Sequence, residues 1–154
     1  MKKTILFAIL LISIIGHSQE QINTNTINTS SFLESDWIVY VSSPKFKIEY
    51  KTSNCDPSKG FDFIGIIFKI TNLTSKKINF YWEKELFYAG TCRTCGYTDE
   101  YSYNVSVAPN SSIEGDCENQ SGFNLKIFLK FNDEIYSEGD ALTSFKLSNL
   151  QLIQ

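Results

Sequence analysis

Histidine, methionine and arginine are almost absent from the 154-residue sequence, which holds one of each. His17 and Met1 lie in the first 18 residues, which we expect to be removed, and Arg93 is the single arginine. A chain without imidazole excludes Ser-His-Asp triads, Cys-His dyads and metal sites with histidine ligands. One arginine also argues against the bidentate arginine clamps used in phosphate chemistry. We therefore expect a protein that is not an enzyme and needs no cofactor.

The N-terminus has the features of an export signal. Two lysines follow the first methionine, and residues 5–15 form an apolar run of 11 residues. The small residues Gly16 and Ser18 stand at the −3 and −1 positions of a cut after Ser18. The run is too short to span a bilayer. We therefore predict a signal peptide over residues 1–18, an exported protein of the periplasm or exterior, and no membrane insertion after cleavage.

The expected mature chain is acidic. Its 136 residues hold 12 Lys or Arg and 17 Asp or Glu, a net charge of −5. This balance argues against nucleic acid as a partner, because such binding depends largely on Lys and Arg that neutralise phosphates. It argues equally against an anionic membrane surface. A chain of this length buries roughly two-thirds of its unfolded surface, so a core can form without help from a metal.

Residues 19–35 are rich in Asn, Thr, Ser and Gln and hold few large apolar side chains. Such a segment buries too little surface to offset its ordering entropy. We predict a flexible leader over residues 19–35 and a single domain over residues 36–154.

Beyond the leader, apolar and polar side chains alternate with the two-residue period of β-strands. Residues 61–71 are apolar on both faces, which predicts a central strand. Leu150 and Leu152 shift the phase set by Phe145 and Leu147, which predicts a bulge in the last strand. About seven strands, with turn residues between them and no 3.6-residue period, indicate an all-β fold, an antiparallel β-sandwich. The expected strands span residues 37–50, 61–71, 77–88, 100–107, 111–115, 123–131 and 145–152.

Residues 68–74 (FKITNLT), followed by an apolar strand start at residues 78–80, describe a strand that ends in an Asn turn before the next strand begins. This pattern resembles small secreted bacterial immunoglobulin-like β-sandwich proteins of uncharacterised function. The short signal and the abundance of Lys, Ile and Asn also resemble proteins of Gram-negative bacteria with AT-rich genomes. The likeness covers about a tenth of the chain and implies an immunoglobulin-like fold, which by itself implies no function.

Four cysteines are the most informative residues: Cys55, Cys92, Cys95 and Cys117. The alternating directions of the expected strands place all four at one end of the sandwich. An even number of cysteines in an exported protein indicates disulfides. The pairing Cys92–Cys95 with Cys55–Cys117 is favoured because a C-x-x-C loop closes on itself, although either of its cysteines can also reach Cys55 or Cys117. A Cys55–Cys117 bond would contribute about 4 kcal/mol in the chain-entropy model.

Two other hypotheses use the same cysteines. The first is a structural zinc site with four thiolate ligands, which the oxidising compartment opposes. The second is a thiol-disulfide redox protein that uses residues 92–95 (CRTC), with Arg93 stabilising a thiolate. Such motifs normally begin a helix, whereas the residues that follow here lead into another strand pattern.

Acidic side chains provide two further candidate sites. Glu114, Asp116 and Glu118 alternate along the chain and are weak candidates for calcium, which takes six to eight oxygen ligands. No spacing matches an EF-hand, so solvated charge is the favoured interpretation. Glu83 and Glu85 share a strand face about 7 Å apart, within the range of inverting glycosidases. No cleft is predicted for them, and protection of a strand edge is the favoured interpretation.

Tyrosines gather along the sequence around the C-x-x-C loop. Exposed aromatic side chains stack on sugar rings or anchor protein interfaces. We therefore predict a non-catalytic binding or accessory module whose partner is an unknown protein or glycan. Its binding surface would consist of Tyr88, Arg93, Tyr97 and Tyr101. The alternatives are a thiol-disulfide redox protein and a metal-binding protein for zinc or calcium.

Overall fold

A computed structural model describes residues 19–29, 36–55, 58, 60, 62–118, 124–132 and 141–153. The predicted signal peptide over residues 1–18 lies outside the described residues. The described residues form eleven strands and one helix of four residues, α1 (Thr98–Tyr101). None of their helices has the length and apolar character that crossing a bilayer requires.

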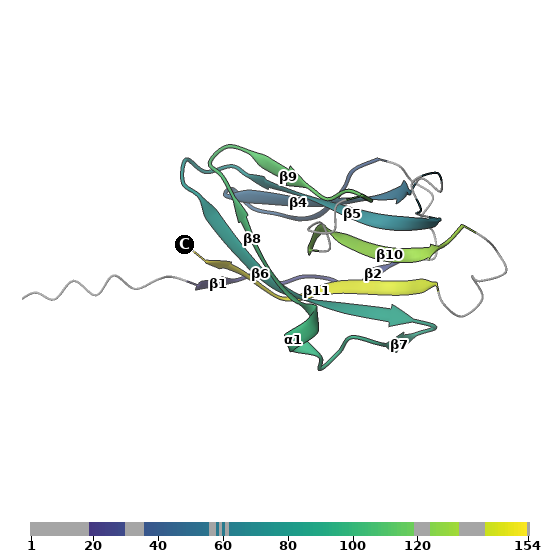
Figure 1. Ribbon diagram of the computed structural model, residues 1–154. Helices are drawn as coiled ribbons and strands as arrows, with labels where there is room; N and C mark the ends of the chain where they lie inside the picture. The colour runs from purple at the N-terminus through teal and green to yellow at the C-terminus, as the bar shows by residue number, and fades with distance from the viewer. Residues whose placement is uncertain are drawn as a thin grey trace, which may run out of the picture.

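The strands form two antiparallel sheets that face each other (Figure 1). Sheet A runs in the order β1-β11-β6-β7, with β2 also paired to β11 and β8 to β6. Sheet B runs in the order β10-β5-β4-β3, with β9 also paired to β5. The strands of sheet A are β1 (Gln19–Gln21), β2 (Ile27–Asn28), β6 (Ile78–Tyr88), β7 (Thr91–Cys92), β8 (Ser102–Val107) and β11 (Leu142–Ile153). Those of sheet B are β3 (Ile38–Ser42), β4 (Phe46–Asn54), β5 (Phe63–Asn72), β9 (Ser112–Glu114) and β10 (Lys126–Phe131).

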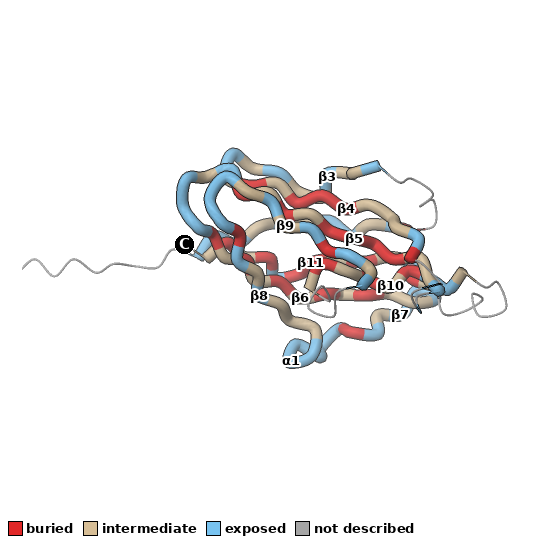
Figure 2. The backbone as a smooth tube through the Cα atoms, turned by 45° about the horizontal axis from the view of Figure 1, so that its top comes forward, coloured by how far each residue is buried: buried red, intermediate tan, exposed pale blue. Residues whose placement is uncertain are grey.

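The hydrophobic core lies between the sheets, because alternate residues of each strand point toward the opposite sheet. Phe46 of β4 meets Phe80 of β6 edge to face, with ring centroids 5.1 Å apart. Phe68 of β5 meets Phe145 of β11 in the same way at 5.6 Å. Figure 2 shows buried residues concentrated along the inner strands and exposed residues on the loops and α1. Burying each such aromatic side chain contributes about 1.5–3 kcal/mol, so these contacts hold the two sheets together.

The strand count differs from the predicted seven for two reasons. Residues 37–50 form two strands, because the Ser43 hydroxyl accepts hydrogen bonds from the amides of Lys45 and Phe46 and turns the chain between β3 and β4. The other additional strands, β1, β2 and β7, have only two or three residues each. A segment of that length is too short to show a two-residue period in the sequence.

The prediction of a flexible leader over residues 19–35 is wrong for residues 19–29. They place β1 and β2 along β11 in sheet A. Their polar side chains take part, since Thr24 and Thr29 donate hydroxyl hydrogen bonds to backbone carbonyls of Leu147 and Leu142. Backbone pairing with an open sheet edge needs no apolar sequence, and composition alone therefore missed it. Residues 30–35 lie outside the described residues.

Two predictions on strand geometry are confirmed. β5 is central, with β4 on one side and β9 and β10 on the other. The pairing of β11 with β6 shifts register between Ser148 and Gln151, which is the predicted bulge. Asn149 stands at the shift with a φ of 49°, so Leu147 and Leu150 both reach the core despite their odd spacing.

Asn149 is exposed and its backbone has a left-handed conformation. Substitutions there therefore act mainly through backbone strain. We expect Asn149→Val to lower the free energy of unfolding by about 1–2 kcal/mol, because a β-branched residue disfavours this conformation. Asn149→Gly, the matched control, should stay within about 0.5 kcal/mol of the natural protein. Urea denaturation measures both, and equal stability of the two variants would contradict the assigned conformation.

Candidate functional site

The residues predicted to form the binding surface lie on segments that follow one another in the chain, from the end of β6 to the end of α1. Tyr88 ends β6, Arg93 lies in the turn that follows β7, and Tyr101 ends α1. These three side chains line one cavity of about 460 Å³. Tyr97, the fourth predicted residue, is 62% exposed and does not line this cavity. The structure therefore brings three of the four predicted residues together in a concave site.

The cavity lies between the two sheets and takes its wall from both. Its lining is mostly aromatic and aliphatic, with a few polar groups, which is typical of small-molecule sites. Its volume falls within the range of about 300–1,000 Å³ found for such sites. Sheet B contributes Phe63, Lys126, Ile127 and Phe128, and sheet A with its connections contributes Lys84, Leu86, Tyr88, Arg93, Thr94, Tyr101 and Tyr103.

Lys84 is the least expected residue of the wall. In β6 the inward positions hold Phe80, Trp82, Lys84 and Leu86, so a lysine occupies a position of the core face and is only 3% exposed. Its ammonium donates a hydrogen bond to the backbone carbonyl of Lys126 at 2.8 Å and lies 4.1 Å from the ring centroid of Tyr103. Burial, and then the charge of Lys126, lower the pKa of Lys84 from 10.5 to about 7.

Lys84 is not among the site residues predicted from the sequence. The signal was present, because Lys84 falls in the same two-residue phase as Phe80, Trp82 and Leu86. A lysine in that phase predicts either a break in the core face or a buried cation.

The turn that carries Arg93 is attached to β6 by a buried threonine. The hydroxyl of Thr94 donates to the carbonyl of Lys84 at 2.6 Å and accepts from the amide of Leu86 at 2.9 Å. The amide of Arg93 donates to the carbonyl of Leu86 at 2.8 Å. These bonds provide partners for backbone carbonyl and amide groups of β6 beyond Glu83, where its pairing with β8 ends. They also fix Arg93 at the rim of the cavity.

Two tyrosines of the wall, Tyr88 and Tyr103, have raised pKa values and are neutral near pH 7. The hydroxyl of Tyr88 donates to the carbonyl of Phe128 at 3.1 Å and so links sheet A to sheet B across the cavity. Burial, and to a smaller extent Tyr101, raise the pKa of Tyr88 to about 12. Burial also raises the pKa of Tyr103. Burial shifts the pKa of these tyrosines away from neutrality, whereas it brings the pKa of Lys84 close to it.

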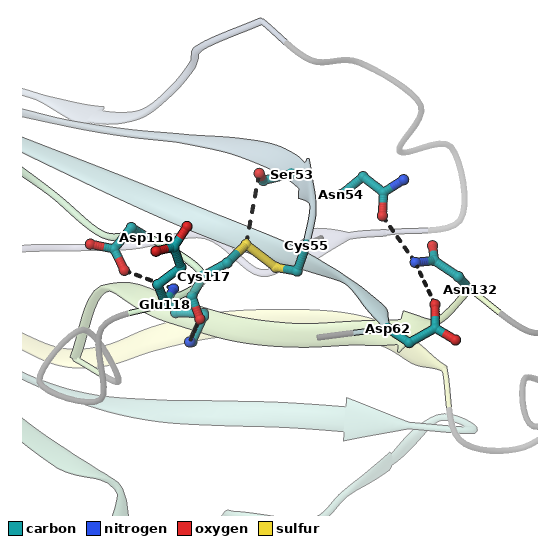
Figure 3. Close-up of a disulfide and its surroundings, with 9 residues drawn as sticks. Ser53, Asn54, Cys55, Asp62, Asp116, Cys117, Glu118 and Asn132 are labelled. Atoms are coloured by element: carbon teal, nitrogen blue, oxygen red, sulfur yellow. Dashed lines mark hydrogen bonds between the residues drawn. A yellow bond between two sulfur atoms is a disulfide. The ribbon is translucent and has the colours of Figure 1, made fainter. Parts of the chain in front are cut away.

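Lys126 connects the cavity to the first disulfide. Its ammonium donates to the carbonyl of Cys117 at 2.9 Å, while its own carbonyl accepts from Lys84. Cys117 is bonded to Cys55, which follows β4 and is fully buried (Figure 3). This bond joins residues 62 positions apart. It therefore ties the ends of two strands of sheet B beside the cavity.

The second disulfide joins Cys92 to Cys95 and closes the turn of Arg93. The two bonds together have the pairing that the sequence favoured. None of the four cysteines is free. A zinc site with four thiolate ligands is therefore incompatible with the structure, because all four sulfur atoms are bonded to one another in pairs.

The calcium candidates do not converge. Glu114 forms an ion pair with Lys51 at 3.1 Å, and the carboxylate of Asp116 accepts a hydrogen bond from the amide of Glu118 at 2.9 Å (Figure 3). Within the described parts of the chain, no three acidic, histidine or cysteine side chains group closely enough to hold a metal ion.

Glu83 and Glu85 lie on the opposite face of β6 from Lys84, because alternate residues of a strand face opposite sides. They are therefore outside the cavity wall. The interpretation as edge protection is wrong for Glu83, where β6 pairs with β11 on one side and with β8 on the other. Glu85 pairs with Lys146 of β11 and lies beyond the pairing with β8. The carboxylate of Glu83 instead accepts a hydrogen bond from Tyr81 at 2.9 Å.

The chain matches no protein-family model and no curated protein. Its function has therefore to be inferred from the chemistry of the cavity. Three cationic side chains, Lys84, Arg93 and Lys126, line the cavity, and none of the described lining residues is acidic.

Lys84 makes stability depend on pH. Below about pH 7 the folded and the unfolded chain both hold the Lys84 proton, and the cost of burying the charge is fully present. Between about pH 7 and the unfolded value of 10.5 only the unfolded chain holds it, so this group makes the free energy of unfolding rise with pH. We expect Lys84→Met to remove that rise and to stabilise the protein at pH 7 by about 1–3 kcal/mol.

Urea denaturation at about pH 7 and about pH 9 measures this effect below the range where tyrosines ionise. Lys130→Met is the matched control, because Lys130 is an exposed lysine of β10 outside the cavity wall. The control should keep the pH dependence of the natural protein. A Lys84→Met variant with that same pH dependence would contradict the buried, destabilised ammonium.

Proposed function

We propose that this chain is an exported, non-catalytic binding module and that the cavity is its ligand site. The observation that carries the proposal is a cavity of about 460 Å³ whose wall is mostly aromatic and aliphatic and holds three cationic side chains. Export to the periplasm or exterior is supported by the signal-like N-terminus and by two disulfides, which persist in oxidising compartments.

We also propose that the fold is an immunoglobulin-like β-sandwich. In its support, the chain changes sheet between β2 and β3, β5 and β6, β8 and β9, and β10 and β11. Repeated crossing between two antiparallel sheets is a property of Greek-key sandwiches. The Cys55–Cys117 bond is unlike the disulfide of antibody domains, because its cysteines follow two strands of one sheet instead of joining the two sheets.

The concave shape of the site favours one kind of recognition. A cavity of this size accepts a small molecule, or one protruding group of a protein or glycan partner, better than a flat protein surface. Tyr88, Tyr101 and Tyr103 offer ring faces and edges for stacking. The exposed Tyr97 is not part of the cavity wall and provides an internal comparison.

Ligand-observed NMR with a fragment library of aromatic compounds and simple sugars tests the proposal. We expect ligands whose affinity falls by about tenfold or more in Tyr101→Ala, because an aromatic wall residue is a typical energetic hot spot. Tyr97→Ala removes the same side chain outside the cavity and should leave those affinities unchanged. The proposal fails if no fragment binds, or if binding is lost in Tyr97→Ala and kept in Tyr101→Ala.

A thiol-disulfide redox protein is the second candidate, and one contact favours it. The backbone amide of Cys95 donates to the Sγ of Cys92 at 3.1 Å, and such a donor would stabilise a Cys92 thiolate after reduction. Cys95 is exposed, so its sulfur can be approached. In exchange, the Cys92 thiolate would attack a substrate disulfide and Cys95 would then displace the substrate thiol.

The reduction of insulin by dithiothreitol distinguishes the two candidates. For a binding module we expect the natural protein and the double variant Cys92→Ala/Cys95→Ala to give the same rate as dithiothreitol alone. The double variant is the control, because it keeps the buried Cys55–Cys117 bond. A faster rate with the natural protein than with the double variant would overturn the non-catalytic assignment.

A further inference from the structure

We infer that the cavity binds a small organic anion with a flat apolar body, such as an aromatic carboxylate. This inference rests on the proposed function, in which the cavity is the ligand site. It adds the charge and the shape of the ligand, which the proposed function leaves open.

The sign of the charge comes from three cations that reach the cavity from separate parts of the fold. Lys84 comes from sheet A, Lys126 from sheet B and Arg93 from the turn closed by Cys92–Cys95. None of the described wall residues is acidic, although the whole chain carries a net charge of −3. Cations gathered between low-dielectric walls concentrate a positive potential inside the cavity.

Strand β6 carries acidic and basic side chains on opposite faces. Its acidic residues Glu83 and Glu85 point to the outer side of sheet A, while Lys84 between them points to the cavity. A positive interior on a negative protein attracts an anion and repels a cation of the same shape.

Lys84 costs stability where it stands, because a buried ammonium is held next to a second lysine. A methionine or leucine would fill the same position of the core face without that cost. An anion in the cavity would offset the repulsion between Lys84 and Lys126. Anion binding would therefore explain why a lysine occupies this position, which packing alone does not explain.

The shape of the ligand comes from the rest of the wall. Phe63 and Phe128 are in ring contact, with centroids 5.6 Å apart, on the sheet B side. Tyr88, Tyr101 and Tyr103 stand on the sheet A side. Flat faces on two sides favour an aromatic body over a branched aliphatic one or a sugar, whose hydroxyls each need a hydrogen-bond partner.

The affinity should also depend on pH in a stated direction. The titratable groups that share the cavity wall with Lys84 are Lys126 from β10, Tyr103 from β8, Tyr101 from α1, Tyr88 from β6 itself and Arg93 from the turn. Lys126 and Tyr103 contact Lys84 directly. Burial raises the pKa of Tyr88 and of Tyr103 above the ordinary tyrosine value, so these two groups stay neutral between about pH 6 and about pH 8.5. The loss of the Lys84 proton therefore controls the change, and anion affinity should fall as pH rises through about 7.

Three probes that differ mainly in charge test the inference: naphthoate, naphthalenemethanol and naphthylmethylamine. Isothermal titration of the mature chain measures each affinity at about pH 6 and about pH 8.5. We expect naphthoate to bind at least about tenfold more tightly than the alcohol at the lower pH, which is about 1.4 kcal/mol. That preference should shrink at the higher pH, and the amine should bind more weakly than the alcohol.

Lys84→Met and Lys130→Met separate the cavity charge from the total charge, since each removes one lysine. Lys84→Met should remove most of the naphthoate preference and its pH dependence while it keeps affinity for the alcohol, which shows that the cavity is still formed. Lys130→Met should behave as the natural protein. Lys126→Met gives a second measure of the cavity charge, and we expect it to weaken naphthoate binding as well.

The outcomes distinguish this inference from the proposed function. If the alcohol binds as tightly as naphthoate and Tyr101→Ala weakens both, the cavity is a ligand site and the anionic class is overturned. If naphthoate binds equally to the natural protein and to Lys84→Met, the anion is not recognised in the cavity and the inference fails. If no probe binds and the fragment library also yields no ligand, the inference and the proposed function fail together.

Discussion

The two-residue alternation of β6 is the constraint on which the candidate site depends. Once Phe80 and Trp82 point into the core, strand geometry also directs Lys84 and Leu86 inward. Strand β6 cannot slip by one residue, because its partners β11 and β8 hold it on both sides and a slip would expose every core residue. The lysine is therefore held inside by the same pairing that places the aromatic core, and the cavity forms around it.

Hydrogen bonds to backbone carbonyls fix the surroundings of the cavity. Lys84 donates to Lys126, Lys126 donates to Cys117, and Tyr88 donates to Phe128. The first and the third of these bonds join residues 42 and 40 positions apart, whereas Lys126 and Cys117 are nine positions apart. Two disulfides close the neighbouring segments. A carbonyl that accepts a hydrogen bond from a lysine ammonium holds the side chain in place without adding a negative charge to the wall.

Sequence reasoning was accurate where a residue pattern has one structural meaning. The apolar faces of residues 61–71 predicted a central strand, and the phase change before Leu150 predicted the bulge. It was inaccurate for residues 19–29. These residues join sheet A through main-chain hydrogen bonds, which composition does not encode. For the site, clustering along the chain identified Tyr88, Arg93 and Tyr101, whereas Lys126 and Phe63 come from sheet B and needed the fold to bring them near.

The distribution of charge around β6 explains how an acidic protein can recognise an anion. Long-range attraction depends on net charge and is screened beyond about 8–10 Å at physiological salt, so the surface neither attracts nor strongly repels a small anion at a distance. Close to the cavity the interaction is local, and low-dielectric walls strengthen it. The outward Glu83 and Glu85 keep the exterior acidic, while Lys84 and Lys126 act only on a group that has entered. Recognition of this kind selects small ligands and excludes polyanions such as nucleic acid, whose binding needs an extended basic surface.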